Sequence, residues 1–149
     1  MKLAHTIQVT VFAKADEDKY EIESKLKELF PFNLIEERIQ IEQSRATGAD
    51  DRPILIYKVV LTKERHTNPF IENLREKLPR EQKDLVLRQL HSRLDDDMDF
   101  FIRLDKDKLM NENTFLVTDS GNCFHIKITI ASFPKKRSNA EKVIREIFR

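Results

Sequence analysis

Strict alternation of apolar and polar side chains near the C-terminus is the feature that most restricts the fold. From Phe124 to Ile130 every second residue is phenylalanine or isoleucine, and His125, Lys127 and Thr129 stand between them. Successive side chains of a strand point to opposite faces, so this pattern predicts a half-buried β-strand over Cys123–Ser132. A sheet built from such strands is covered on one side.

Other segments show the same period or are rich in β-branched residues. We expect further strands over Thr6–Ala13, Arg38–Gln43, Ile54–Thr62, Phe100–Leu104 and Thr114–Val117. The ten residues Ser44–Pro53 form the predicted loop of a hairpin and include Gly48, one of two glycines in the chain. Asp119–Asn122 is typical of a tight turn into the last strand.

Amphipathic helices are predicted between the strands. Ile22, Leu26 and Leu29 recur at helical spacing after an acidic start at Asp16, and Pro31 ends this helix. Further on, Asn68 is the expected cap of a helix with Pro69 at its first position.

Three more helical segments follow. Pro79 marks a break between two packed helices, and Asp105–Met110 is expected to form one helical turn. Ser138 and Glu141 have the spacing of a capping box at the start of the last helix. The order β-α-β-β-α-α-β-β-β-α predicts one α+β domain over residues 1–149. We expect a two-layer sandwich, with a mixed or mainly antiparallel sheet and helices packed on one face.

Composition restricts the class of protein. Of 149 residues, 40% are hydrophobic, which is enough for a core, and 36% are charged with a net charge of only +1. The single cysteine, Cys123, excludes an internal disulfide and a four-cysteine zinc site. No stretch approaches the ~18 apolar residues of a membrane span. We therefore expect a soluble cytoplasmic protein without membrane contact.

Charge is distributed unevenly. Residues 121–149 carry seven basic and two acidic side chains, whereas residues 95–120 carry three and eight. Lys135, Lys136 and Arg137 directly precede the last predicted helix, whose N-terminus is itself partly positive. This arrangement is suited to a phosphate oxygen, although such clusters are also often just solvated.

The exposed side of the predicted sheet supports a polyanion partner. If Phe100 and Ile102 are buried, Phe101 and Arg103 point outward with Lys127 and His125, and aromatic and guanidinium planes among cations suit unstacked RNA bases. The alternative is that a loop or second subunit covers Phe101. Arg45 and Arg52, in the predicted hairpin loop, are further candidate RNA contacts.

Catalytic and metal motifs are weak. Cys123 and His125 share a strand face, but no glycine-rich oxyanion loop accompanies them. Asp95, Asp97 and Asp99 copy the start of a calcium loop without its glycine or closing glutamate, so a solvated acidic turn is expected, with a loose magnesium site as the alternative. We expect no catalytic residue, no metal and no cofactor.

Several segments resemble a known family. The opening HTIQVTVFAKADEDKYEIESKLKELFP, the segment RPILIYKVVL, the helix break at LPREQ and above all FFIRLDKDKLMNENTFLV resemble small archaeal proteins described as predicted RNA-binding proteins or predicted exosome-associated subunits. The likeness runs from about Lys2 to Ser132. It implies an α+β fold similar to the large-subunit ribosomal protein that binds 5S ribosomal RNA, an archaeal source and a non-enzymatic role.

The leading hypothesis is an RNA-binding accessory factor of RNA processing or degradation, with exosome or ribosomal components as expected partners. Its predicted RNA contacts are Lys127, Lys135, Lys136, Arg137, Arg103, Phe101, Arg45 and Arg52. A second hypothesis is a protein-interaction or homodimerisation module that uses the exposed sheet face. A third, less favoured, is a hydrolase that uses Cys123 and His125.

Overall fold

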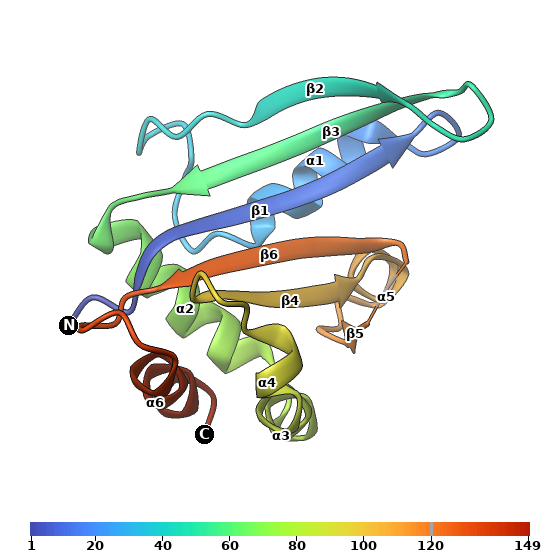
Figure 1. The fold of residues 1–149 in the computed structure, drawn as a ribbon. Helices are drawn as coiled ribbons and strands as arrows, with labels where there is room; N and C mark the ends of the chain where they lie inside the picture. Colours follow the sequence, from blue (N-terminus) through green and yellow to red (C-terminus); the bar gives the residue numbers. More distant parts are fainter. Residues whose placement is uncertain (120) are drawn as a thin grey trace.

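A six-stranded sheet forms one layer of the protein and helices form the other (Figure 1). The computed structural model describes residues 1–119 and 121–149. The strands are β1 (Ala4–Lys14), β2 (Glu42–Thr47), β3 (Pro53–Leu61), β4 (Asp99–Asp105), β5 (Val117–Thr118) and β6 (Cys123–Ile130). They pair in the order β2-β3-β1-β6-β4-β5, and every pairing is antiparallel.

The helical layer covers one face of this sheet (Figure 1). The helices are α1 (Lys19–Glu28), α2 (Glu64–Lys77), α3 (Arg80–Arg88), α4 (Leu90–Arg93), α5 (Lys106–Glu112) and α6 (Arg137–Phe148). Alternate strand residues such as Val9, Val59, Ile102 and Ile126 are completely buried beneath them. The predicted single-domain α+β architecture with helices on one face is therefore confirmed, and the sheet is antiparallel.

Strand β2 overlaps only the end of the strand that the sequence pattern predicts. Of the predicted strand Arg38–Gln43, Arg38 ends a turn with a φ of 59°, the next three residues are irregular, and only the last two belong to β2. The N–H of Ile39 donates to the carbonyl of Leu34 at 2.9 Å. The strand itself takes up the first part of the predicted loop, and all six of its side chains are exposed. Because an edge strand without a buried face shows no alternation of hydrophobic and polar residues, its position cannot be predicted from that pattern. The predicted strand Thr114–Val117 likewise shrinks to β5.

Helix α2 begins earlier than its apparent cap. It starts at Glu64, so Pro69 lies inside the helix and Asn68 does not cap it. The Asn68 side chain instead accepts from the Leu3 N–H at 3.1 Å and donates to the Met1 carbonyl at 2.8 Å. A residue type that favours helix caps serves here to fix the N-terminal segment.

The other predicted helix starts also differ in detail. Asp18, rather than Asp16, caps α1 by accepting from two backbone N–H groups. The predicted capping box is wrong, because α6 begins at Arg137 and its N-cap Lys136 makes no side-chain cap bond. Glu141 pairs with His91 instead, at 3.0 Å. The break at Pro79 is confirmed, since α2 ends and α3 begins around it.

The segment before β6 is described in part. The predicted turn Asp119–Asn122 includes Ser120, which lies outside the described residues. Gly121 has a φ of +86°, a left-handed conformation that glycine adopts without steric cost. Within residues 1–119 and 121–149, no helix has the length and apolar character to cross a bilayer.

Candidate functional site

Four side chains from β4 and β6 meet on the open face of the sheet. In the antiparallel register, Phe101 lies opposite Lys127 and Arg103 lies opposite His125. All four alternate with buried residues along their strands and are partly exposed. We call this set the β4–β6 cluster. It is the group that the sequence predicts for the open face.

Two rings of the β4–β6 cluster contact each other. The centroids of Phe101 and His125 are 5.6 Å apart, with an interplanar angle of 38°. Burial lowers the pKa of His125, and the nearby charges of Arg103 and Lys127 lower it further. The imidazole is therefore neutral at neutral pH, and the two rings together present an apolar surface flanked by two fixed positive charges.

The two cations of the cluster differ in their partners. Lys127 Nζ lies 3.8 Å from Oδ2 of Asp99, whose Oδ1 accepts from the Thr129 hydroxyl at 2.6 Å. Arg103 forms no side-chain hydrogen bond or ion pair with any other residue that the structure describes. Its planar guanidinium thus has donors available for a ligand.

A hollow of about 420 Å³ adjoins the cluster at the edge of β4. Its lining residues come from the end of α3, from α4, from β4 and from the segment after β5. They are Gln89, Ser92, Arg93, Phe101, Arg103 and Asp119. The hollow therefore includes two members of the β4–β6 cluster.

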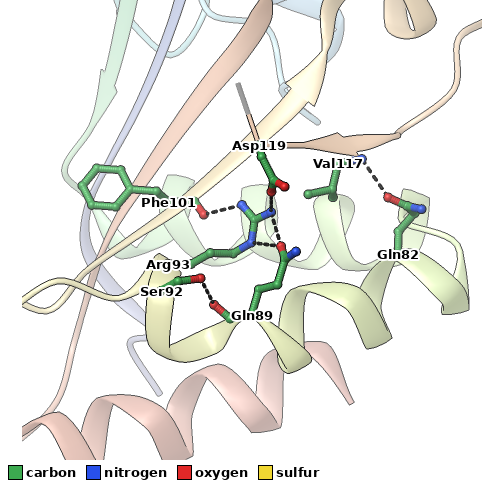
Figure 2. A network of polar contacts seen from close by, with 7 residues as sticks. All are labelled: Gln82, Gln89, Ser92, Arg93, Phe101, Val117 and Asp119. Carbon is green, nitrogen blue, oxygen red and sulfur yellow. Dashed lines mark hydrogen bonds and ion pairs between the residues drawn. The ribbon is translucent and has the colours of Figure 1, made fainter. Parts of the chain in front are cut away.

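Arg93 organises one wall of this hollow (Figure 2). Its Nε and Nη2 donate to Oε1 of Gln89 at 3.0 and 2.6 Å, and its Nη1 donates to the Phe101 carbonyl at 3.2 Å. Nη2 also donates to Oδ1 of Asp119 at 3.3 Å. Burial lowers the pKa of the Arg93 guanidinium, Asp119 opposes this shift, and an arginine stays charged regardless.

The sequence interpretation missed Arg93, Gln89 and Asp119. The sequence does carry a signal for Arg93 and Gln89. These two residues are four apart, a spacing that places side chains on one helix face, and they flank the buried Leu90. Asp119 carries no such signal, since only the fold brings the end of β5 next to α4.

The basic residues before α6 do not act as one group. Lys135 and Lys136 are exposed in the loop that joins β6 to α6. Arg137 is partly buried: its Nη2 donates to the His91 carbonyl at 2.9 Å, and it lies 3.9 Å from both Asp96 and Glu141. Arg137 therefore attaches α6 to α4 and the loop before β4.

Arg45 and Arg52 lie apart from the β4–β6 cluster. Arg45 belongs to β2 and is in register with Leu55, which shares a sheet face with the buried Tyr57. Its side chain thus extends from the face opposite to the cluster. Arg52 pairs with Asp50 at 3.4 Å inside the hairpin loop.

The geometry gives the catalytic motif no support, whereas it brings the carboxylates of the acidic turn together: one oxygen each of Asp95, Asp97 and Asp99 lie within 4.8 Å of one another. Burial raises the pKa of the Cys123 thiol, while Arg103 and Lys106 lower it by less, so the thiol is protonated at neutral pH. In the acidic turn, one oxygen of Asp95 accepts from the backbone N–H groups of Asp97 and Asp99, each at 2.9 Å. This carboxylate stabilises its own turn.

The fold and site together define a small α+β protein with an open, cationic and aromatic sheet face. A family model described as RNA binding matches residues 6–132, and the chain belongs to this family. The chain is 28% identical over 143 residues to RNA-binding protein PAB1135 of Pyrococcus abyssi, and the match covers 96% of this chain and 92% of that protein.

Solved structures agree with this placement. The chain is similar to protein AF2318 from Archaeglobus fulgidus, with a TM-score of 0.84, 28% identity, and coverage of 97% of this chain and 99% of that one. It is also similar to Mth689, a DUF54 protein from Methanothermobacter thermautotrophicus, with a TM-score of 0.79, 26% identity and 99% coverage of each chain.

Proposed function

We propose that this protein binds unpaired RNA through the β4–β6 cluster and that it does so without catalysis. The observation that carries the proposal is the free guanidinium of Arg103 beside the contacting rings of Phe101 and His125. Unstacked bases bind to such planes by stacking, and cations at the same place neutralise phosphates. The family match and the name of the Pyrococcus relative support this ligand class.

Additional phosphate contacts are proposed at Lys135 and Lys136. Both ammonium groups are exposed, and neither has an ion-pair partner among the described residues. Arg137 contributes to the same surface mainly by holding α6 in place. Arg45 and Arg52 would contact RNA only if it passes around the edge strand β2, because they lie away from the cluster.

The proposed biological role is that of an accessory factor in archaeal RNA processing or degradation, with exosome or ribosomal components as partners. The sequence resemblance of the FFIRLDKDK segment supports this role, and the named relatives come from archaea. The absence of catalysis is also part of the proposal. The raised pKa of Cys123 supports it, because a protonated thiol is a poor nucleophile.

A second candidate function is supported by the part of the open sheet face on β1 and β3, beside the β4–β6 cluster. Phe12 is 49% exposed there and lines a hollow together with His125, and its register neighbour Ile56 is only partly buried. Such a surface would fit a protein partner or a second copy of this chain. The two functions differ in their dependence on salt, which is steep only for a polyanion.

The test compares an Arg103→Ala/Lys127→Ala variant with an Arg88→Ala/Lys142→Ala control. The control removes the same two charges from α3 and α6, in the helical layer. Each protein is titrated with short single-stranded RNA at several salt concentrations. We expect weaker binding in the cluster variant alone, with a salt slope shallower by about 0.7 for each phosphate that it no longer neutralises. Equal binding by the two variants would exclude the cluster, and no binding by the wild type would favour the protein-interaction function.

A further inference from the structure

We propose that the hollow beside β4 is a pocket for one guanine base of unpaired RNA. This inference rests on the proposed function and gives it a base preference. The residues that line it include an aromatic residue, an arginine with available hydrogen-bond donors and a carboxylate, namely Phe101, Arg103 and Asp119. Figure 2 shows the carboxylate of Asp119 beside Arg93, whose guanidinium also binds the Phe101 carbonyl.

Phe101 supplies the stacking surface. It is partly exposed and belongs both to the lining of the hollow and to the contact with His125. A base that lies against Phe101 would replace water on an apolar ring, which is the usual source of stacking affinity. This interaction alone would not distinguish one base from another.

Asp119 supplies the selective group. Among the described residues only Arg93 engages it, through Oδ1 at 3.3 Å, and its side chain is 80% exposed. An ionised carboxylate only accepts hydrogen bonds and offers about four lone-pair positions. Its ligand must therefore present N–H donors, and it binds best when two donors stand side by side.

Guanine is the RNA base whose edge fits this requirement. Its N1–H and its N2 amino group are adjacent donors, whereas adenine and cytosine each present one amino group next to an acceptor nitrogen. Uracil presents one N–H between two carbonyl oxygens. Arg103, with its unengaged donors in the same hollow, can bind the acceptors O6 and N7 of guanine, the commonest arginine contact to that base.

The wall behind Asp119 is fixed before any ligand binds. Arg93 has a side chain that is 6% exposed and is held by Gln89 and by the carbonyl of Phe101. It connects the carboxylate to the strand that carries the aromatic ring. A site held in this way loses little conformational entropy on binding.

The experiment measures binding of short oligouridine RNAs that carry one central guanosine, adenosine, cytidine or inosine. For the wild type we expect the guanosine oligomer to bind at least about fivefold more tightly than the adenosine and cytidine oligomers and than plain oligouridine. Inosine lacks the N2 amino group, so its oligomer should bind with intermediate affinity. This comparison needs no variant of the protein.

Asp119→Asn then tests the residue, with Asp107→Asn as its control. Asp107 is an exposed carboxylate on α5, so both variants remove one negative charge, and any general electrostatic gain in affinity appears in both. We expect the guanosine preference to vanish only in Asp119→Asn. Equal binding of all oligomers, or a guanosine preference that survives in Asp119→Asn, would overturn the pocket and leave RNA binding intact. If the wild type binds no RNA at all, the proposed function itself fails.

Discussion

The ammonium group of Lys106 lies 2.9 Å from Oε1 of Glu17, in a pair that joins α5 to the segment before α1. The Lys106 side chain is only 1% exposed. Its Nζ also donates to the carbonyl of Phe12 at the end of β1 and to Oδ1 of Asn122 before β6. A buried ammonium with all its donors engaged positions these segments relative to one another.

The first prediction is that Lys106→Met destabilises the fold. The change leaves the Glu17 carboxylate without its partner and the Phe12 carbonyl without its donor. Breaking a buried ion pair costs about 3–5 kcal/mol, and we expect a loss near the lower limit because Glu17 is partly exposed. Lys108→Met is the control, since the Lys108–Glu112 pair is exposed and solvent-exposed ion pairs contribute little to stability. Urea unfolding measures both, and equal losses would contradict the prediction.

The second prediction concerns how the stability of the fold depends on pH in the acidic range. Burial acts to raise the pKa of Glu17, but the Lys14 N–H and Lys106 together outweigh it, so the pKa lies below its ordinary value of 4.5. A lowered pKa in the folded state means that the group stabilises the fold above its ordinary pKa. That stabilisation is lost as pH falls through the folded value.

The expected result is that wild-type unfolding free energy falls as pH drops below about 4.5. Glu17→Gln should be less stable at neutral pH and should lose part of this acid dependence. Urea unfolding at a series of pH values gives both curves. Parallel curves for the two proteins would mean that Glu17 is not a source of the acid dependence.

Strands with one buried face were predictable from the sequence, and the rest of the sheet was not. In β1, β4 and β6 the buried and exposed residues alternate, and the predicted boundaries are close to those observed. In β2 every side chain is exposed, so pairing with β3 depends on backbone hydrogen bonds, which no side-chain pattern records. Ile39 and Ile41 alternate with polar residues like strand residues but lie in the irregular segment before β2.

Half of the candidate site could be predicted for the same reason. Phe101, Arg103, His125 and Lys127 lie on strands whose buried residues are evident, so their shared face follows from the period alone. The wall formed by Arg93 and Asp119 depends on how α4 packs against the edge of β4, a contact between distant segments. The capping residues predicted wrong starts for two helices. Helix α2 begins at Glu64 and not after Asn68, and α6 begins at Arg137 and not after Ser138.

A third prediction separates the basic residues before α6. Lys135→Ala/Lys136→Ala should make the salt slope of single-stranded RNA binding shallower by about 1.4, because two phosphates are no longer neutralised and each accounts for about 0.7. Folding should be unchanged, since neither lysine has an ion-pair partner among residues 1–119 and 121–149. Arg88→Ala/Lys142→Ala is again the control, and its salt slope should equal that of the wild type. An unchanged slope in the lysine variant would remove these residues from the RNA surface.

The fourth prediction is that Arg137→Ala, unlike the lysine variant, lowers the stability of the fold and has little effect on the salt slope of RNA binding. This change leaves the His91 carbonyl without a donor and removes the ion pairs with Asp96 and Glu141. We expect stability to fall by about 1 kcal/mol, the contribution of one partly exposed hydrogen bond, with a smaller effect on the salt slope than either lysine. Thermal unfolding together with RNA titration measures the two effects. A large change in slope without a change in stability would assign Arg137 to the phosphate surface after all.

The last prediction concerns Phe101, which belongs both to the cluster and to the lining of the hollow. Phe101→Leu keeps an apolar side chain of similar size on β4 but removes the aromatic face that contacts His125. Stacking of a base on an aromatic ring contributes about 1–3 kcal/mol, so RNA affinity should fall by at least about fivefold while the salt slope stays the same. Phe12→Leu makes the identical change at another exposed phenylalanine of the open face and should leave affinity unaltered. Fluorescence anisotropy at constant salt, with melting temperatures to check folding, compares the three proteins. If the two variants lose affinity equally, bases do not stack on Phe101 in preference to the rest of the sheet.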